Sequence, residues 1–235
     1  MLRDQIARWL SPASPEADQR SVEPQPLDDI STALMADVLS RVPAKKALVI
    51  LDCGVGMAST VNFFSHFDCR IAFVDLLAVQ QTIEQSEAQL RESEEGFVSF
   101  SKQQLVGLYD DALASYGLEC IDICLFWDLP NYLPAEFFHA LMESLRPRLH
   151  EHTLGHLIGA YNARSSVTTA CYGLKDLTTL SQAHPRQAIG QRFHAYKQGE
   201  IVQLLRPMAV DRSRLLGEGR VEYLLKYHVP SELNG

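Results

Sequence analysis

The sequence lacks the signals of several protein classes. No apolar run approaches the ~20 residues that span a bilayer, and the N-terminus has no signal-peptide core. Dense runs of Lys or Arg, which neutralise phosphates, are absent, and the formal net charge is −8. These absences argue against a membrane span and against polymeric nucleic acid as a partner. The five cysteines form no CxxC pair, so reduced thiols in a cytoplasmic protein are expected.

The chain length of 235 residues predicts one globular domain. Residues 1–26 read as a short helix followed by a proline-rich linker, and residues 27–235 as the globular domain, beginning with a helix at 27–42. The N-terminal helix either folds back on its own domain or docks on a protein partner or on a second copy. A polar insert at residues 162–198 either shapes a substrate site or forms a variable surface excursion.

The most informative segment covers residues 47–60. An apolar run ends at Asp52, and two glycines follow, Gly54 and Gly56, before a helical pattern opens at Ala58. This order predicts a buried strand, a tight turn and a helix whose N-terminus faces the turn. Glycines allow the backbone to approach a ligand closely, and helix N-termini offer N–H donors to anionic groups. A strand-to-helix turn without a ligand is the alternative.

The pattern Asp-x-Gly-x-Gly-x-Ala resembles the first motif of the class I S-adenosylmethionine (SAM) dependent methyltransferases, in which a third glycine usually stands where Ala58 is. The dinucleotide fingerprint G-x-G-x-x-G is incomplete, because Ser59 takes its third glycine position. The resemblance implies an α/β fold: a three-layer Rossmann-like sandwich with a mostly parallel, seven-stranded sheet. Residues 208–216 and 220–229 predict its C-terminal antiparallel hairpin. The implied cofactor is S-adenosyl-L-methionine.

Two further strand ends fit the resemblance. Asp75 ends the next apolar run, where the family places an acid that binds ribose hydroxyls; capping of the following helix is the alternative. A mostly apolar run over residues 120–127 predicts a fully buried strand, and it ends in Trp127, which Asp128 follows. Trp127 and the nearby Tyr132 are either core aromatics or part of the substrate lining. After a predicted third strand at 97–100, Gln103 stands near the position of the family's adenine-binding acid.

The resemblance also implies roles for these residues. Methyl transfer is direct, so the enzyme chiefly orients donor and acceptor. Asp128 is the candidate for holding the methionine part or the acceptor, and His194 is a candidate base. The expected cofactor-binding set is Asp52, Gly54, Gly56, Ala58, Asp75, Gln103, Trp127 and Asp128.

Three histidines, at positions 150, 152 and 156, would share one face of a strand and could hold zinc, but surface or strand-end roles are favoured and no metal is predicted. The first function hypothesis is therefore a SAM-dependent methyltransferase acting on a small molecule or a protein. The second is a protein of the same fold without turnover that serves as a binding or assembly partner. A dehydrogenase ranks third because the glycine spacing disfavours it.

Overall fold

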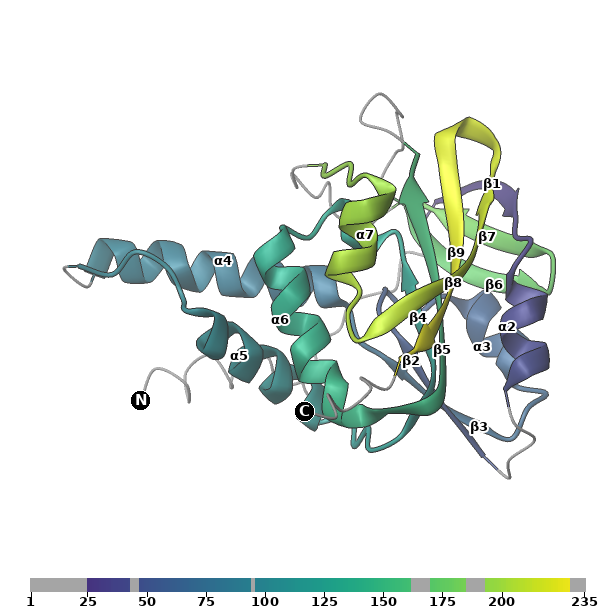
Figure 1. Cartoon of the computed structure of the whole chain (residues 1–235), viewed down its shortest axis with the longest axis horizontal. Coiled ribbons are helices and arrows are strands. Elements are labelled where there is room, and N and C mark those ends of the chain that lie inside the picture. The colour runs from purple at the N-terminus through teal and green to yellow at the C-terminus, as the bar shows by residue number, and fades with distance from the viewer. Residues whose placement is uncertain (1–24, 43–46, 94–95, 162–169, 185–192, 229–235) are drawn as a thin grey trace, which may run out of the picture.

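The computed structural model describes residues 25–42, 47–93, 96–161, 170–184 and 193–228. Within these residues the main sheet has six strands (Figure 1). Four neighbouring strands run parallel, and the strand Arg220–Tyr227 is antiparallel to both of its neighbours. The predicted Rossmann-like α/β sheet with a closing antiparallel hairpin is confirmed. In spatial order the strands are β3 (Cys69–Phe73), β2 (Leu48–Asp52), β4 (Ile121–Trp127), β5 (Leu149–Ala160), β9 (Arg220–Tyr227) and β8 (Met208–Leu215).

Two layers cover this sheet (Figure 1). One face packs against the helices α4 (Leu76–Ser93), α5 (Lys102–Ala114), α6 (Ala135–Leu145) and α7 (Gln198–Leu204). The other face packs against α2 (Met35–Arg41), α3 (Ala58–Phe64) and a three-stranded sheet of β1 (Pro26–Ser31), β7 (Thr179–Ala183) and β6 (Cys171–Asp176). Short 3-10 turns follow β4, α6 and β8, at Leu129–Asn131, Arg146–Arg148 and Gly217–Gly219.

Strand β4 lies at the centre of this sandwich, and all of its residues are buried. Because successive side chains of a strand point to opposite faces, Cys124 and Phe126 belong to the core beneath the long helices. Leu125 and Trp127 belong to the core beneath the small sheet. Burial on both faces explains why the strand, apart from Asp122, reads as an apolar run rather than an alternating one.

The small sheet was not predicted. The expected helix at 27–42 is instead the strand β1 followed by the shorter helix α2. Strand β1 pairs antiparallel with β7, with Ile30 opposite Leu180, and the hydroxyl of Thr32 accepts a hydrogen bond from Met35 N (3.3 Å) where α2 begins. The predicted insert at 162–198 supplies both partner strands, so part of it belongs to the core instead of forming a surface excursion.

The strand predicted at 97–100 is also absent from the described structure, which leaves six strands in the main sheet instead of seven. The N–H of Phe100 donates to the buried carboxylate of Glu87 on α4 (2.7 Å) instead of to a neighbouring strand. The N-terminal helix and most of the linker predicted within residues 1–26 lie outside the described residues. In the described part of the chain, no helix combines the length and apolarity needed to cross a membrane.

Candidate functional site

A cleft opens where the parallel strands β2, β3 and β4 end. Its empty volume, including space open to solvent, is about 460 Å³. Open α/β sheets bind their ligands at this edge, outside the carboxyl ends of the strands. Of the predicted site residues, the cleft brings together Gly54, Asp75, Trp127 and Asp128. The full lining is Cys53, Gly54, Val55, Asp75, Leu77, Phe126, Trp127, Asp128, Leu129, Ala170, Cys171 and Tyr172.

Asp52 supports this cleft from behind and does not line it. Its Oδ1 atom accepts hydrogen bonds from Gly54 N (2.9 Å) and from Trp127 Nε1 (2.7 Å). Burial raises the pKa of Asp52 from 3.8 to about 7, while these two bonds oppose the rise because they favour the charged form. The acid before the first glycine therefore fixes the turn and the end of β4.

The two glycines of the turn leave room for aromatic rings of the chain itself. A Cβ atom added to Gly54 would lie 3.0 Å from Trp127 Cδ1, and one added to Gly56 would lie 3.0 Å from Phe73 Cγ. Trp127 has a left-handed backbone (φ 49°), and its ring stacks on Tyr172 with centroids 6.0 Å apart and planes 13° apart. Close approach of the backbone is thus required by internal packing, whether or not a ligand also uses it.

The two carboxyl groups in the cleft differ in environment. Asp75 is half-buried, and its Oδ1 accepts a hydrogen bond from Ala78 N (3.1 Å) at the start of α4. A carboxylate has further acceptor sites, so the capping role leaves capacity for a ligand. Asp128 is 3% exposed, and burial raises its pKa to about 7 against opposing effects of its own backbone N–H, Tyr172 and Arg220.

The other predicted residues lie outside the cleft lining. Ala58 begins α3, and Gln103 is exposed near the start of α5. His194 N donates to Asn131 O (2.6 Å) just after β4, and its ring stacks on Tyr196. Their roles remain predictions. Conversely, Tyr172 lines the cleft without having been singled out as a site residue. It belongs to the insert at 162–198, for which a role in shaping a substrate site was one of two expectations, and no local pattern indicates that β6 crosses to this edge of the main sheet.

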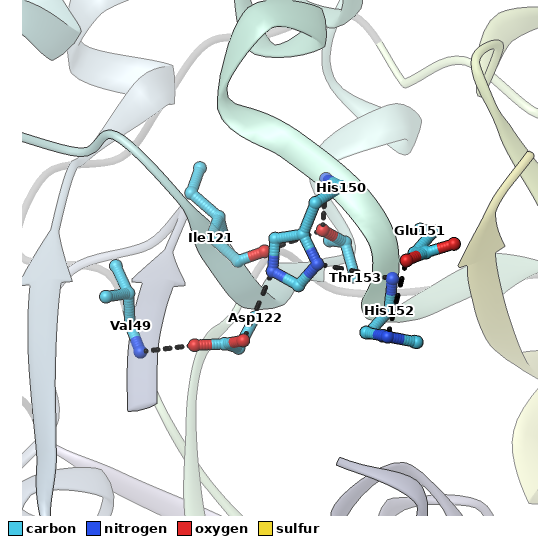
Figure 2. Close-up of polar contacts among 7 residues, drawn as sticks. All are labelled: Val49, Ile121, Asp122, His150, Glu151, His152 and Thr153. Atoms are coloured by element: carbon cyan, nitrogen blue, oxygen red, sulfur yellow. Dashed lines mark hydrogen bonds and ion pairs between the residues drawn. The ribbon is translucent and has the colours of Figure 1, made fainter. Parts of the chain in front are cut away.

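The three histidines do not come together at one site: the rings of His150 and His152 lie near each other, with centroids 6.1 Å apart, and His156 lies elsewhere. His150 Nε2 lies 3.2 Å from Asp122 Oδ1, and its Nδ1 accepts a hydrogen bond from His152 N (3.2 Å). Figure 2 shows this arrangement at the beginning of β5, where the carboxylate of Asp122 also reaches Val49 N. His156 lies further along β5, fully buried, with Nε2 2.6 Å from Glu222 Oε1. No group of three or more potential metal ligands occurs among the described residues.

No protein-family model and no curated protein sequence matches the chain. Among solved structures, it is similar to a SAM-dependent methyltransferase from Methanosarcina mazei (TM-score 0.46, 10% identity, 82% of this chain and 97% of the other). It is also similar to the glycopeptide N-methyltransferase MtfA (TM-score 0.44, 12% identity, 84% of this chain and 96% of the other). A third similar structure is the Burkholderia thailandensis 1,6-didemethyltoxoflavin-N1-methyltransferase, solved with bound 1,6-didemethyltoxoflavin and S-adenosylhomocysteine (TM-score 0.42, 16% identity, 84% of this chain and 79% of the other). Similarities this low carry no argument about the activity of this chain.

Proposed function

We propose that the protein is a SAM-dependent methyltransferase that acts on a small molecule or a protein side chain. The observation that carries this proposal is the cleft at the carboxyl ends of β2, β3 and β4, where the glycine turn faces Asp75 and Asp128. The strand-turn-helix arrangement around Gly54 matches the motif that the sequence shares with the family.

The chemistry of the lining fits SAM. The cofactor carries a positive sulfonium and an ammonium group, and the cleft offers two carboxyl groups, with no Lys or Arg among those lining residues that the structure describes. Asp75 would accept hydrogen bonds from the ribose hydroxyls, each about 1.5–3 kcal/mol for a charged acceptor. Asp128 would hold the methionine part or the acceptor. No hydrogen bond from a described residue reaches its buried Oδ2 atom, which suits a group that receives a ligand.

In this proposal SAM supplies an activated methyl group, and the protein contributes orientation and a water-poor site. Trp127 and Tyr172 form a stacked apolar wall, and Phe126 and Leu129 extend it. Such a wall fixes the acceptor relative to the donor, which is the main source of acceleration in a direct transfer. His194 remains the candidate base of the proposal, and Gln103 the candidate acceptor for the adenine amino group.

The second candidate is a protein of this fold without turnover that acts as a binding or assembly partner. Packing of Trp127 on Gly54 and of Phe73 on Gly56 favours it, because the chain's own rings occupy the space beside the glycines. Cytoplasmic localisation, a domain boundary near residue 26, and a protein partner or second copy bound through the N-terminal helix belong to this set of proposals as well.

Calorimetry separates the candidates. The methyltransferase proposal expects measurable SAM binding and no preference for NAD. Asp75→Ala should weaken SAM binding at least tenfold, about 1.4 kcal/mol. Asp75→Asn is the matched control, because its amide oxygen can still accept from Ala78 N and preserve the helix start. Absence of SAM binding to the wild-type protein rejects the enzyme, and unchanged affinity in Asp75→Ala removes Asp75 from the site.

A further inference from the structure

A second cleft lies beside the first. It has about 500 Å³ of empty space, including space open to solvent, and it is lined by Ile30, Ser31, Leu216, Gly217 and Arg220. Ile30 and Ser31 end β1, whereas Leu216 and Gly217 lie in the turn between β8 and β9. Arg220 begins β9. Since Arg220 pairs with Ala160, the last residue of β5, this cleft lies at the same edge of the sheet as the proposed SAM site.

The guanidinium of Arg220 gives this cleft its chemical character. Arg220 is 8% exposed, yet it contributes to the lining together with the hydroxyl-bearing Ser31. Guanidinium groups bind carboxylates with two parallel hydrogen bonds, and their five N–H donors can serve a ligand in addition to partners within the chain. Ile30 and Leu216 add apolar surface beside this charge.

Other groups nearby define what the cleft selects. Glu222 is two residues further along β9, but its oxygens already accept hydrogen bonds from His156, Thr32 and Ala33 N. The protein as a whole is acidic, with a net charge of −8, so an anion has little general attraction to it. A buried arginine at the cleft therefore supplies the local attraction that an anionic ligand needs.

Arg220 also connects the two clefts. Ala160, which pairs with Arg220, donates its N–H to Asn131 Oδ1 (3.2 Å), three residues after Asp128 in the lining of the first cleft. The charge of Arg220 accordingly lowers the pKa of Asp128 and of Tyr172 against the larger rise caused by burial. A molecule held by Arg220 would thus lie next to the residues proposed to face the methyl donor. We propose that the methyl acceptor is a small organic acid, whose carboxylate binds Arg220 and whose apolar body packs on Ile30 and Leu216. That the bound molecule is a methyl acceptor rests on the proposed function. That it carries a carboxylate rests on the second cleft.

The test uses benzoate and benzamide, which share their shape and differ in charge, with binding measured by ligand-observed NMR. We expect the wild-type protein to bind benzoate roughly tenfold more tightly than benzamide. Arg220→Gln should remove this preference, whereas Arg214→Gln, at an exposed position on the same hairpin, should keep it. Benzamide binding as well as benzoate, or unchanged benzoate affinity in Arg220→Gln, would overturn the inference.

A second variant covers the case in which Arg220→Gln does not fold. Gly217 lies in the cleft lining, and nothing lies within 4 Å of a Cβ atom added there, so Gly217→Phe should fold and fill the cleft. Gly199 on α7 is equally open and lies outside the lining, so Gly199→Phe is the control. Benzoate binding should be lost only in Gly217→Phe; binding retained there contradicts the inference.

Calorimetry with SAM on the same variants separates this inference from the proposed function. Should the wild-type protein bind SAM but not distinguish benzoate from benzamide, the acceptor class is wrong and the methyltransferase proposal stands. Should it distinguish them without binding SAM, the organic-acid site stands and the methyltransferase proposal fails.

Discussion

Trp127 Nε1 donates a hydrogen bond of 2.7 Å to Asp52 Oδ1, and this bond joins the ends of the neighbouring strands β4 and β2. The same oxygen accepts from Gly54 N, so one buried carboxyl group fixes both the glycine turn and the indole that covers it. The strained backbone of Trp127, with φ 49°, is held in place by this bond and by the stack on Tyr172. The shape of the cleft depends on this arrangement.

Trp127→Phe should therefore destabilise the protein. The substitution keeps an aromatic ring against Tyr172 but leaves the buried Oδ1 atom of Asp52 with one donor instead of two. A buried acceptor that loses its partner costs about 1–3 kcal/mol, measurable by urea unfolding. Tyr161→Phe is the control, at an exposed aromatic residue. Equal stability of Trp127→Phe and the wild-type protein would show that the bond contributes nothing.

The free energy of unfolding should fall as the pH rises from about 4 to 7. Burial raises the pKa of Asp52 and of Asp128 from 3.8 to about 7. Between these values the folded state holds protons that the unfolded chain has released, and stability then decreases with pH. Urea unfolding at several pH values measures this slope. Asp128→Asn should reduce it, and Asp68→Asn, at an exposed position, should not. A slope unchanged in Asp128→Asn contradicts this account.

The local parts of the site could be predicted from the sequence. Asp52, Gly54 and Asp75 lie in strand-turn-helix segments whose order along the chain already places them at the strand ends. Pairing between distant segments could not be predicted in this way. Ile30 pairs with Leu180, and nothing in residues 27–31 taken alone indicates that partner. The small sheet, and with it Tyr172 in the cleft, was therefore missed.

A side-chain contact also explains why the strand predicted at 97–100 does not form. The aromatic and β-branched residues of Phe97-Val-Ser-Phe100 are typical of a short strand. The rings of Phe97 and Phe100 pack together, with centroids 5.4 Å apart. The backbone N–H of Phe100, however, bonds to Glu87. A glutamate that caps a loop from within a helix has no signature in a single sequence, because the same residue on the helix surface would look identical.

His156 and Glu222 should form a stabilising pair whose contribution is lost in acid. Burial raises the pKa of Glu222, but bonds from His156, Thr32 and Ala33 N outweigh it and hold the pKa below its ordinary value of 4.5. The stability that this pair contributes is therefore present above pH 4.5 and decreases as the pH falls below it. Glu222→Gln should cost about 1–3 kcal/mol near neutral pH, because it weakens the hydrogen bonds that the buried carboxylate accepts.

A double-mutant cycle measures this coupling. His156→Gln combined with Glu222→Gln should be less destabilised than the sum of the single variants, since the pair shares one interaction. Denaturant unfolding near neutral pH gives the three free energies. Additive losses would mean that the two residues contribute independently, despite the 2.6 Å between Nε2 and Oε1.

Gly173 should be the glycine most sensitive to substitution, because it seats the small sheet on the glycine turn. A Cβ atom added there would lie 2.6 Å from Met57 Cβ and would also clash with Ser59 Oγ. The neighbouring Leu174 N donates to Thr60 Oγ1 (3.0 Å), so β6 is fixed against the start of α3 and cannot shift freely. We expect Gly173→Ala to lower the free energy of unfolding by about 1–3 kcal/mol, as overpacking of a core does.

Gly107 provides the contrast. It lies inside α5, and an added Cβ atom meets nothing within 4 Å. Gly107→Ala should therefore stabilise the protein by about 0.5–1 kcal/mol, through the higher helix propensity of alanine. Urea unfolding of both variants under one condition gives opposite signs if the packing of β6 on α3 is correct. A neutral Gly173→Ala beside a stabilised Gly107→Ala would mean that β6 does not press on the turn, and the wall that Tyr172 contributes to the cleft would lose its support.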